Sequence, residues 1–402
     1  MHGTTLSRRA LLALGAGGVV APRALAGPAP AGDRRLIVVF VKGGWDTTYF
    51  VDPKLGLPTV DGPELDEDPG DPYDREWIRT FGEIPIVVND VKRPNVSRFF
   101  ERWADRCAVV NGIATGSIAH GAARMRVLSG SHLPDQPDLC SAVGADDARY
   151  PVGALDFSGD GQTGVTAPST ARIGRSRQLG LLAAPVAHGD ALDAYFRSRL
   201  TQLGPDRVQP GADEALDRAR RLRDEAGVAL SALPLATHEL DDDVTTAVDL
   251  LAAGVARAAL LESSAAWDTH TNNPVQHNLL DDLFSALGVL ADGLDAASLL
   301  DDTLVVVVSE MTRSPRRNDT AGKAHWPGTS AVLFGAGVSG GRVVGATDAD
   351  LLAMAVDPVT GRPDPSGSMV THGAFAAGIL RHLDVDPARW LPDATPFSAW
   401  AR

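Results

Sequence analysis

Four short polar motifs contain the residues of this chain that are best suited to chemistry. They are separated by long stretches of sequence and read Gly43-Gly44-Trp45-Asp46, Trp267-Asp268-Thr269-His270, Ser309-Glu310 and His325-Trp326-Pro327. Carboxylates and imidazoles are the oxygen and nitrogen ligands with which proteins hold divalent metals. The residue types therefore predict a metal site, and its candidate ligands are Asp46, Asp268, His270, Glu310 and His325.

Two of these motifs directly follow hydrophobic runs, at 36–41 and 304–308. In an open α/β sheet, the carboxyl ends of the parallel strands form the crevice in which ligands bind. Asp268 and His270 are two residues apart and would share one face of an extended segment. We therefore expect these motifs to meet at one edge of a sheet.

Each candidate also has an ordinary structural interpretation. Asp46 follows two glycines, where an aspartate often caps a turn. Asp268 and His270 would then be a cap and a surface histidine. Glu310 would pair with Arg313 or Arg316, because an unpaired buried carboxylate is costly. His325 would be an exposed loop residue.

The hydrophobic patterning predicts strands that alternate with helices. Strands are expected at 34–41, 84–88, 107–113, 154–157, 303–308, 330–334 and 342–344, and helices at 96–105, 213–226, 243–263, 273–294 and 373–383. The segment 51–82 is predicted to be a surface excursion, and the arginines after residue 308 are predicted to lie in a loop. This alternation indicates an α/β fold, a doubly wound and mostly parallel sheet with helices on both faces.

Two familiar glycine motifs occur between residues 335 and 341 and are rejected. The segment fits both G-x-G-x-x-G and G-x-S-x-G, and each motif requires a helix directly afterwards. Here Arg342-Val343-Val344 has the pattern of a strand. The glycines are predicted to form a hairpin turn, so neither a dinucleotide site nor a serine triad is expected.

Residues 1–26 have the pattern of an export signal. Arg8-Arg9 precedes an apolar stretch, and Ala24-Leu25-Ala26 is a small-x-small cleavage site. The paired arginines favour the twin-arginine translocase as a partner, with an ordinary secretion signal or an uncleaved anchor as alternatives. We expect a periplasmic or extracellular protein with no stable membrane span in the mature chain.

The formal net charge is −14, and without the three arginines of residues 1–26 it would be near −17. An acidic protein does not bind nucleic acid or anionic lipid by bulk charge. Residues 27–402 are predicted to form a single domain with insertions. The two cysteines, Cys107 and Cys140, are compatible with a disulfide or with two buried thiols.

Taken together, these motifs resemble domain-of-unknown-function family 1501, whose members are exported and belong to the alkaline phosphatase and sulfatase superfamily. The stretches that carry the resemblance are the export signal and V-F-V-K-G-G-W-D, W-D-T-H, V-V-S-E-M-T-R-S-P-R, A-H-W-P and G-G-R-V-V-G-A-T-D. The resemblance implies an alkaline phosphatase-like fold with one or two metals at the strand ends. It also implies that Asp46, Asp268, His270, Glu310 and His325 correspond to metal-binding positions.

The chain departs from this superfamily at two positions. Met311 stands where a ligating histidine is usual and cannot replace it. Sulfatases have C/S-x-P-S-R at the nucleophile, whereas here the matching stretch is His120-Gly-Ala-Ala-Arg124. By this resemblance His120 is a ligand, a general base or a nucleophile, and Arg124 would clamp an ester oxygen. Ser117 is a less favoured substitute for the nucleophile.

Two functions are compatible with these residues. One is an exported, metal-dependent hydrolase of a phosphate or sulfate ester, with zinc, manganese or calcium as the metal. The other is a non-catalytic metal-binding protein of the cell envelope with a binding or assembly role. Trp45, Trp267 and Trp326 each neighbour a candidate ligand, and we expect them to form an apolar wall rather than simply to pack.

Overall fold

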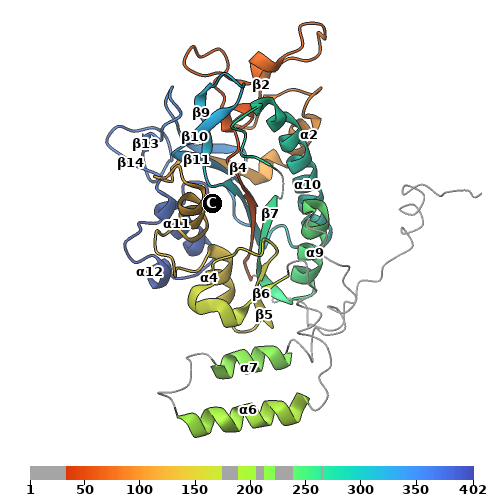
Figure 1. Cartoon of the computed structure of the whole chain (residues 1–402), viewed down its shortest axis with the longest axis vertical. Coiled ribbons are helices and arrows are strands. Elements are labelled where there is room, and N and C mark those ends of the chain that lie inside the picture. The colour runs from red at the N-terminus through yellow and green to blue at the C-terminus, as the bar shows by residue number, and fades with distance from the viewer. Residues whose placement is uncertain (1–32, 174–188, 205–211, 222–238, 264–265) are drawn as a thin grey trace, which may run out of the picture.

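The computed structural model describes residues 33–173, 189–204, 212–221, 239–263 and 266–402 (Figure 1). The predicted export signal at residues 1–26 lies outside these ranges. None of the helices in the described parts of the chain combines the length and apolar character that crossing a bilayer requires.

An eight-stranded sheet forms the centre of the molecule. Its strand order is β12-β4-β11-β8-β1-β7-β5-β6. Only β11 runs antiparallel to its neighbours, and every other pairing is parallel. The strands are β1 (Arg35–Val41), β4 (Cys107–Ala114), β5 (Val152–Asp156), β6 (Thr170–Arg172), β7 (Ala256–Ser263), β8 (Thr303–Ser309), β11 (Gly328–Gly335) and β12 (Arg342–Gly345).

Helices cover both faces of this sheet, as Figure 1 shows. On one face lie α2 (Pro94–Trp103), α9 (Leu240–Ala252) and α10 (Gln276–Ala296), and on the other lie α3 (His120–Ser129), α4 (Leu139–Ala145), α11 (His372–His382) and α12 (Pro387–Trp390). Side chains of β1 alternate between the two resulting cores, with Ile37 and Val39 in one and Leu36 and Val38 in the other. The doubly wound, mostly parallel sheet predicted from the sequence is confirmed.

Residues 243–263 were predicted to be one helix, and this prediction is wrong. The helix α9 ends at Ala252, Gly254 adopts a positive φ of 68°, and β7 begins at Ala256. β7 pairs with β1 in the middle of the sheet and is buried on both faces, so it has no polar alternation that would mark it as a strand. Its alanines and leucines fit a helix equally well.

The arginine-rich segment after β8 is a hairpin rather than the predicted loop. It consists of β9 (Thr312–Arg317) and β10 (Lys323–Trp326), which pair antiparallel. The hairpin packs closely on the segment after β7: a Cβ on Gly322 would lie 1.9 Å from the carbonyl oxygen of His270. Only glycine fits there, and the close approach places His325 beside His270.

The glycines at 335–341 do not form the predicted hairpin. β11 and β12 lie on opposite sides of β4, so the glycines carry the chain across the amino end of that strand. The amide of Gly341 donates to the carbonyls of Ala104 and Cys107, each at 2.8 Å. A Cβ on Gly340 would lie 1.7 Å from the carbonyl oxygen of Asp105. The rejection of the two helix-dependent motifs holds, because a strand follows.

Residues 51–82 are more tightly packed than a surface excursion. The segment contains β2 (Trp77–Phe81), which pairs with β3 (Ile84–Val88). Asp66 accepts two hydrogen bonds from Arg317, at 2.7 and 2.8 Å, and one from the Tyr49 hydroxyl at 2.7 Å. Glu76 forms a fully buried ion pair with Arg93. These contacts fasten the segment to the hairpin and to the sheet.

Cys107 and Cys140 are both free and buried. Cys107 begins β4, and Cys140 lies in α4 with its thiol 3.2 Å from the carbonyl oxygen of Ala259. Burial raises the pKa of each thiol well above its ordinary value. Of the two interpretations open from the sequence, the structure has the pair of buried thiols.

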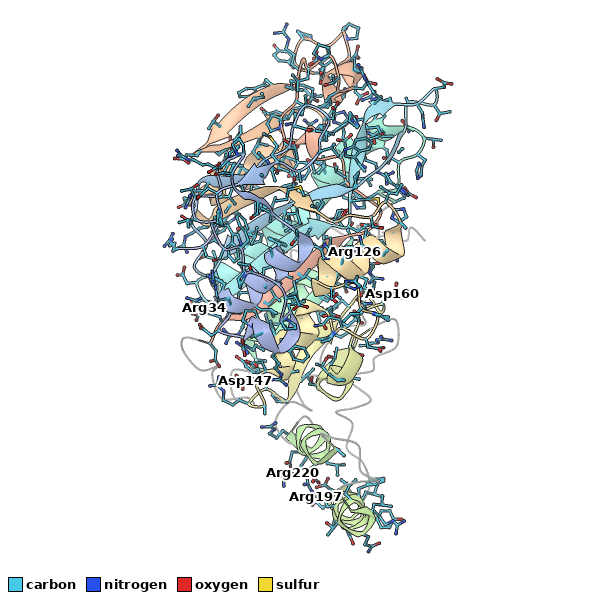
Figure 2. The ribbon with its side chains drawn as sticks, turned by 90° about the vertical axis from the view of Figure 1, so that its left-hand side faces the viewer. Arg34, Arg126, Asp147, Asp160, Arg197 and Arg220 are labelled. Atoms are coloured by element: carbon cyan, nitrogen blue, oxygen red, sulfur yellow. The ribbon has the colours of Figure 1, made fainter. Side chains whose placement is uncertain are left out.

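The described part of the region between β6 and α9 contains two further helices, α6 (Gly189–Leu203) and α7 (Ala212–Arg221). Figure 2 shows Arg197 on α6 and Arg220 on α7, at the end of the molecule far from Arg126. The predicted helix at 213–226 corresponds to α7, and residues 222–226 lie outside the described ranges. These helices take no part in the site below.

Candidate metal centre

Three side chains from distant parts of the chain meet at the carboxyl edge of the sheet. They are His120, Asp268 and His325, and one ligand atom of each lies within 4.8 Å of the others. His120 is the first residue of α3, Asp268 follows β7, and His325 lies in β10. The sheet topology explains the meeting, because β7 ends and β11 begins at this edge, and β10 leads directly into β11.

One ring nitrogen of His120 is hydrogen-bonded within the protein, and the other has no hydrogen-bond partner among the described residues. Its Nδ1 lies 2.7 Å from the Oε1 of Glu310, so Nδ1–H donates to that carboxylate. Its Nε2 is buried, has no hydrogen-bond partner among the described residues, and lies 3.3 Å from the Oδ2 of Asp268. A buried nitrogen lone pair without a donor is the state that a metal ion would satisfy.

His325 is oriented in the same way. Its Nδ1 lies 2.7 Å from the carbonyl oxygen of Ile118, which can only accept a hydrogen bond. The proton is therefore on Nδ1, and the lone pair of Nε2 points to the cluster, 3.1 Å from the Oδ1 of Asp268. The carbonyl of Ile118 lies two residues before His120, so one loop orients both imidazoles.

His270 lies at the rim of this cluster. Its Nε2 is 2.8 Å from the Nε2 of His325 and 3.2 Å from the Oδ1 of Asp268. Burial lowers the pKa of His270 in spite of the neighbouring Asp268 carboxylate. A lowered pKa favours the neutral imidazole, which is the form that binds metals.

Asp268 is held ionised by a buried arginine. The Nη2 of Arg313 lies 2.7 Å from its Oδ1, and Arg313 is fully buried. Burial alone would raise the pKa of Asp268, but the hydrogen bond and the positive charge of Arg313 oppose it, and the pKa is lowered to about 2. Asp268 is thus a carboxylate at any physiological pH.

Asp46 is close to this region, but the structure does not bring it into the cluster. It is fully buried, and its Oδ2 lies 2.7 Å from the ammonium of Lys323. The same oxygen accepts from Asn273 at 2.9 Å, while Oδ1 accepts from the hydroxyl of Thr48 at 2.6 Å. Both carboxylate oxygens therefore have partners within the protein.

Glu310 accepts the hydrogen bond from Nδ1 of His120 and so orients its ring. Its Oε1 also accepts the amide of Gly43 at 2.8 Å, and its Oε2 accepts the hydroxyl of Ser309 at 3.0 Å. Neither Arg313 nor Arg316 pairs with it, contrary to the structural interpretation of the sequence. Glu310 is therefore placed to fix the tautomer of His120 rather than to compete with it for an ion.

This placement predicts the effect of Glu310→Gln. Since the partner of a ligating histidine typically contributes about 10–100-fold in metal affinity, the variant should bind metal more weakly by that factor and keep the same stoichiometry. Competition against a chelator of known affinity measures the change. Glu262→Gln, on the same edge but outside the cluster, is the control. Complete loss of stoichiometric binding would instead make Glu310 a ligand.

Arg124 lies on α3 but is engaged elsewhere. It approaches Asp160 at 3.2 Å and Glu262 at 3.3 Å, and its guanidinium lies 5.3 Å from the centre of the Phe40 ring. Lys42 contacts the same two carboxylates, each at 3.4 Å. An ester oxygen would have to compete with both carboxylates for Arg124, so its predicted role as a clamp stays a prediction.

The three tryptophans differ in their burial. Trp45 and Trp267 are fully buried in the core, and their indoles donate to Thr329 at 3.1 Å and to Ser263 at 3.0 Å. Trp326 is partly exposed. Two of the three therefore pack in the interior beneath the site, contrary to the predicted apolar wall.

Sequence reasoning missed two basic residues that organise the site, Arg313 and Lys323. Arg313 was considered only as a partner of Glu310, and Lys323 was not considered. Lys323 and His325 are two residues apart, so recognition of a strand at 323–326 would have placed them on one face. The predicted loop concealed that signal.

The fold and the site define a class of α/β protein. Its members have a doubly wound sheet, with histidines and a carboxylate suited to metal binding at the carboxyl edge. The family model described as "Protein of unknown function (DUF1501)" matches residues 33–157 and 199–388. The chain belongs to this family, as the sequence motifs predicted. No curated protein matches the sequence.

Several solved structures are similar to this one. A protein in the alkaline phosphatase superfamily from Vibrio parahaemolyticus is 11% identical with a TM-score of 0.40, over 91% of this chain and 71% of that chain. The phosphonate monoester hydrolase of Agrobacterium radiobacter is 12% identical with a TM-score of 0.36, over 91% and 78%. The lipoteichoic acid synthase LtaP from Listeria monocytogenes is 9% identical with a TM-score of 0.40, over 92% and 75%. Because these identities are so low, we argue the chemistry of the site only from the residues of this chain.

Proposed function

We propose that this protein is an exported, metal-dependent hydrolase that acts on a phosphate or sulfate ester. The observation that carries the proposal is the buried Nε2 of His120, which has no partner among the described residues and faces the carboxylate of Asp268. The proposed ligands are His120, Asp268, His270 and His325. Asp46 and Glu310, also predicted as ligands, would instead support the site.

The spacing of these groups fits one ion. Bonds of about 2.0–2.2 Å from nitrogen and oxygen ligands to a tetrahedral ion place neighbouring ligand atoms roughly 3.4 Å apart. Four contacts among these side chains lie between 2.8 and 3.3 Å, and His120, Asp268 and His325 each offer one ligand atom within 4.8 Å of the others, with His270 at the rim. Imidazole with carboxylate suits zinc and manganese better than calcium, which prefers an all-oxygen shell.

His120, Asp268, His270 and His325 would hold a divalent metal, which would lower the pKa of a bound water and stabilise an anionic transition state. The chain contributes the geometry: Glu310 and the Ile118 carbonyl fix the two ring tautomers, and Arg313 keeps Asp268 ionised. His120 stands at the position that resembles the sulfatase nucleophile. As a ligand or a general base it would leave the attack on the ester to a water molecule, so no covalent intermediate is required.

The accessibility of the cluster favours catalysis over a closed structural site. The side chains of His120, Asp268 and His270 are 37%, 45% and 49% exposed. An ion there would keep a coordination position open to water and substrate, as catalytic sites do. The alternative, a metal-binding envelope protein without activity, is favoured by the engagement of Arg124 with Asp160 and Glu262.

The export part of the proposal rests on Arg8-Arg9 and the apolar stretch that follows. It makes the twin-arginine translocase a partner during export and places the mature protein in the periplasm or outside the cell. Residues 27–402 would then be the mature domain.

An assay of metal-loaded protein tests the catalytic proposal. Aryl phosphate and aryl sulfate monoesters are offered to protein with about one equivalent of zinc or manganese, and to His120→Gln as the comparison. We expect turnover of one ester class by the wild type and a loss of kcat/KM of at least about 100-fold in the variant. Full metal occupancy with no turnover of any ester would favour the binding protein.

A further inference from the structure

A cavity lies beside the loop that orients the metal cluster. Its volume is about 310 Å³, and its lining includes Thr115, Gly116, Arg126, His132 and His372. Three of these residues are basic, and no aspartate or glutamate lines the cavity. In a chain with a formal net charge of −14, such a concentration of basic groups is unexpected.

Arg126 has no carboxylate partner. Its Nη1 donates to the carbonyls of Thr115 at 2.9 Å and Gly116 at 2.6 Å, and no carboxylate of the described residues lies within salt-bridge distance. Arg124, two residues earlier on the same helix, is paired with Asp160 and Glu262. Figure 2 labels both Arg126 and Asp160. The charge of Arg126 therefore remains available to the cavity.

Two histidines line the cavity together with Arg126. Burial lowers the pKa of His372, a hydrogen bond to the Ala114 carbonyl opposes that effect, and the charges of Arg126 and His132 lower the pKa further. His132 is exposed, and His372 is the first residue of α11. An anion in the cavity would pair with the charge of Arg126 and favour the protonated, donating form of His372.

The cavity is connected to the metal cluster through the chain itself. Thr115 and Gly116 begin the loop whose Ile118 carbonyl orients His325 and which ends at His120. The helix α3 carries His120 at its start and Arg126 six residues later, a rise of about 9 Å along the axis. The cavity and the cluster are therefore built on the same loop and the same helix.

We propose that this cavity, the anion pocket, binds a second phosphate or sulfate group of the substrate whose ester is hydrolysed at the metal cluster. The substrate class is then a polyanion rather than a simple monoester. This inference rests on the proposed hydrolase function for the identity of the substrate, whereas the binding of an anion in the pocket does not.

Binding is measured on the full-length, zinc-loaded protein by following the imidazole NMR signals of His132 and His372 during titration with inorganic phosphate. We expect saturable shifts of both signals that weaken at least about tenfold in Arg126→Gln, because a charged hydrogen-bonding partner is lost. Arg98→Gln, an exposed arginine on α2 at the other face of the sheet, should bind as the wild type does. Asp268→Asn should also retain the shifts.

Arg126 donates hydrogen bonds to two carbonyls of the loop, so Arg126→Gln also removes loop contacts. His132→Gln is a second variant that leaves these contacts intact, and it should weaken phosphate binding severalfold. If the NMR shifts survive in both Arg126→Gln and His132→Gln, or disappear only in Asp268→Asn, phosphate does not bind in the anion pocket and the proposal is wrong. The KM for an aryl ester bearing a second phosphate should be about tenfold lower than that of the monoester, and His132→Gln should reduce this difference. Equal KM values despite phosphate binding would mean that the pocket takes a free anion, and would overturn the polyanion assignment.

Discussion

Replacing Asp268 with asparagine is expected to remove the bound metal and leave the fold intact. The carboxylate is the only anionic member of the cluster and contacts all three histidines, at 3.1 Å from His325, 3.2 Å from His270 and 3.3 Å from His120. Its low pKa makes it an ionised ligand at neutral pH. Asparagine keeps the shape and one oxygen for Arg313 but loses the charge that a divalent ion requires.

We expect metal content to fall from about one equivalent to less than about a tenth, an affinity loss of at least about 100-fold. Elemental mass spectrometry of the purified variant measures it. Asp160→Asn removes an exposed carboxylate from the same edge and should leave metal content unchanged. An Asp268→Asn protein that is folded and still carries a full equivalent would show that this cluster is not the metal site.

Asp46→Ala is expected to destabilise the protein strongly without removing the metal. The substitution would leave the fully buried ammonium of Lys323 without its carboxylate partner. Breaking a buried ion pair by removing one member costs about 3–5 kcal/mol in the free energy of unfolding. Urea denaturation measures this cost. If Asp46 were a ligand, the variant would instead lose metal.

A double variant separates the ion pair from other effects of Asp46. Asp46→Asn/Lys323→Met removes both charges and keeps approximate volumes, so it should recover most of the lost stability. Asp301→Asn, which breaks an exposed pair with Arg106, should have a much smaller effect. If the Asp46→Ala protein is stable but has lost its metal, Asp46 is a metal ligand and the ion-pair interpretation is wrong.

The hydrophobic patterns were sufficient to predict those strands of the sheet that are rich in β-branched residues. β1 and β8 consist largely of valine, with isoleucine, leucine and phenylalanine, and both were predicted within one residue of their bounds. β7 has the composition Ala-Arg-Ala-Ala-Leu-Leu-Glu-Ser, which favours a helix locally. Its pairing with β1 and β5 decides the outcome, and pairing between distant strands is not encoded in local spacing.

The candidate ligands show a similar division. Asp268, His270 and His325 were selected from the sequence and lie together in the structure, because each belongs to an element that ends or begins at the same sheet edge. Asp46 has the same sequence context but is paired with Lys323, a residue from a hairpin that was predicted to be a loop. The partner of a buried charge depends on tertiary packing, so the sequence alone could not separate ligand from ion pair.

His120 entered the candidate site only through its resemblance to the sulfatase nucleophile position. No local pattern marks a histidine at the start of a helix as a ligand. Its proposed role as a ligand rests on Glu310, which follows β8, holds Nδ1 and leaves Nε2 without a hydrogen-bond partner among the described residues. The two residues are 190 positions apart in sequence.

The central claim is that one metal ion binds between His120, Asp268 and His325, and anomalous diffraction from a zinc-soaked crystal tests it most directly. We predict one strong anomalous peak about 2.0–2.2 Å from the Nε2 atoms of His120 and His325 and from the Asp268 carboxylate. The ammonium of Lys323 should still contact Asp46, with no peak beside it. A peak at Asp46, or no peak at the histidine cluster under saturating zinc, would contradict the account.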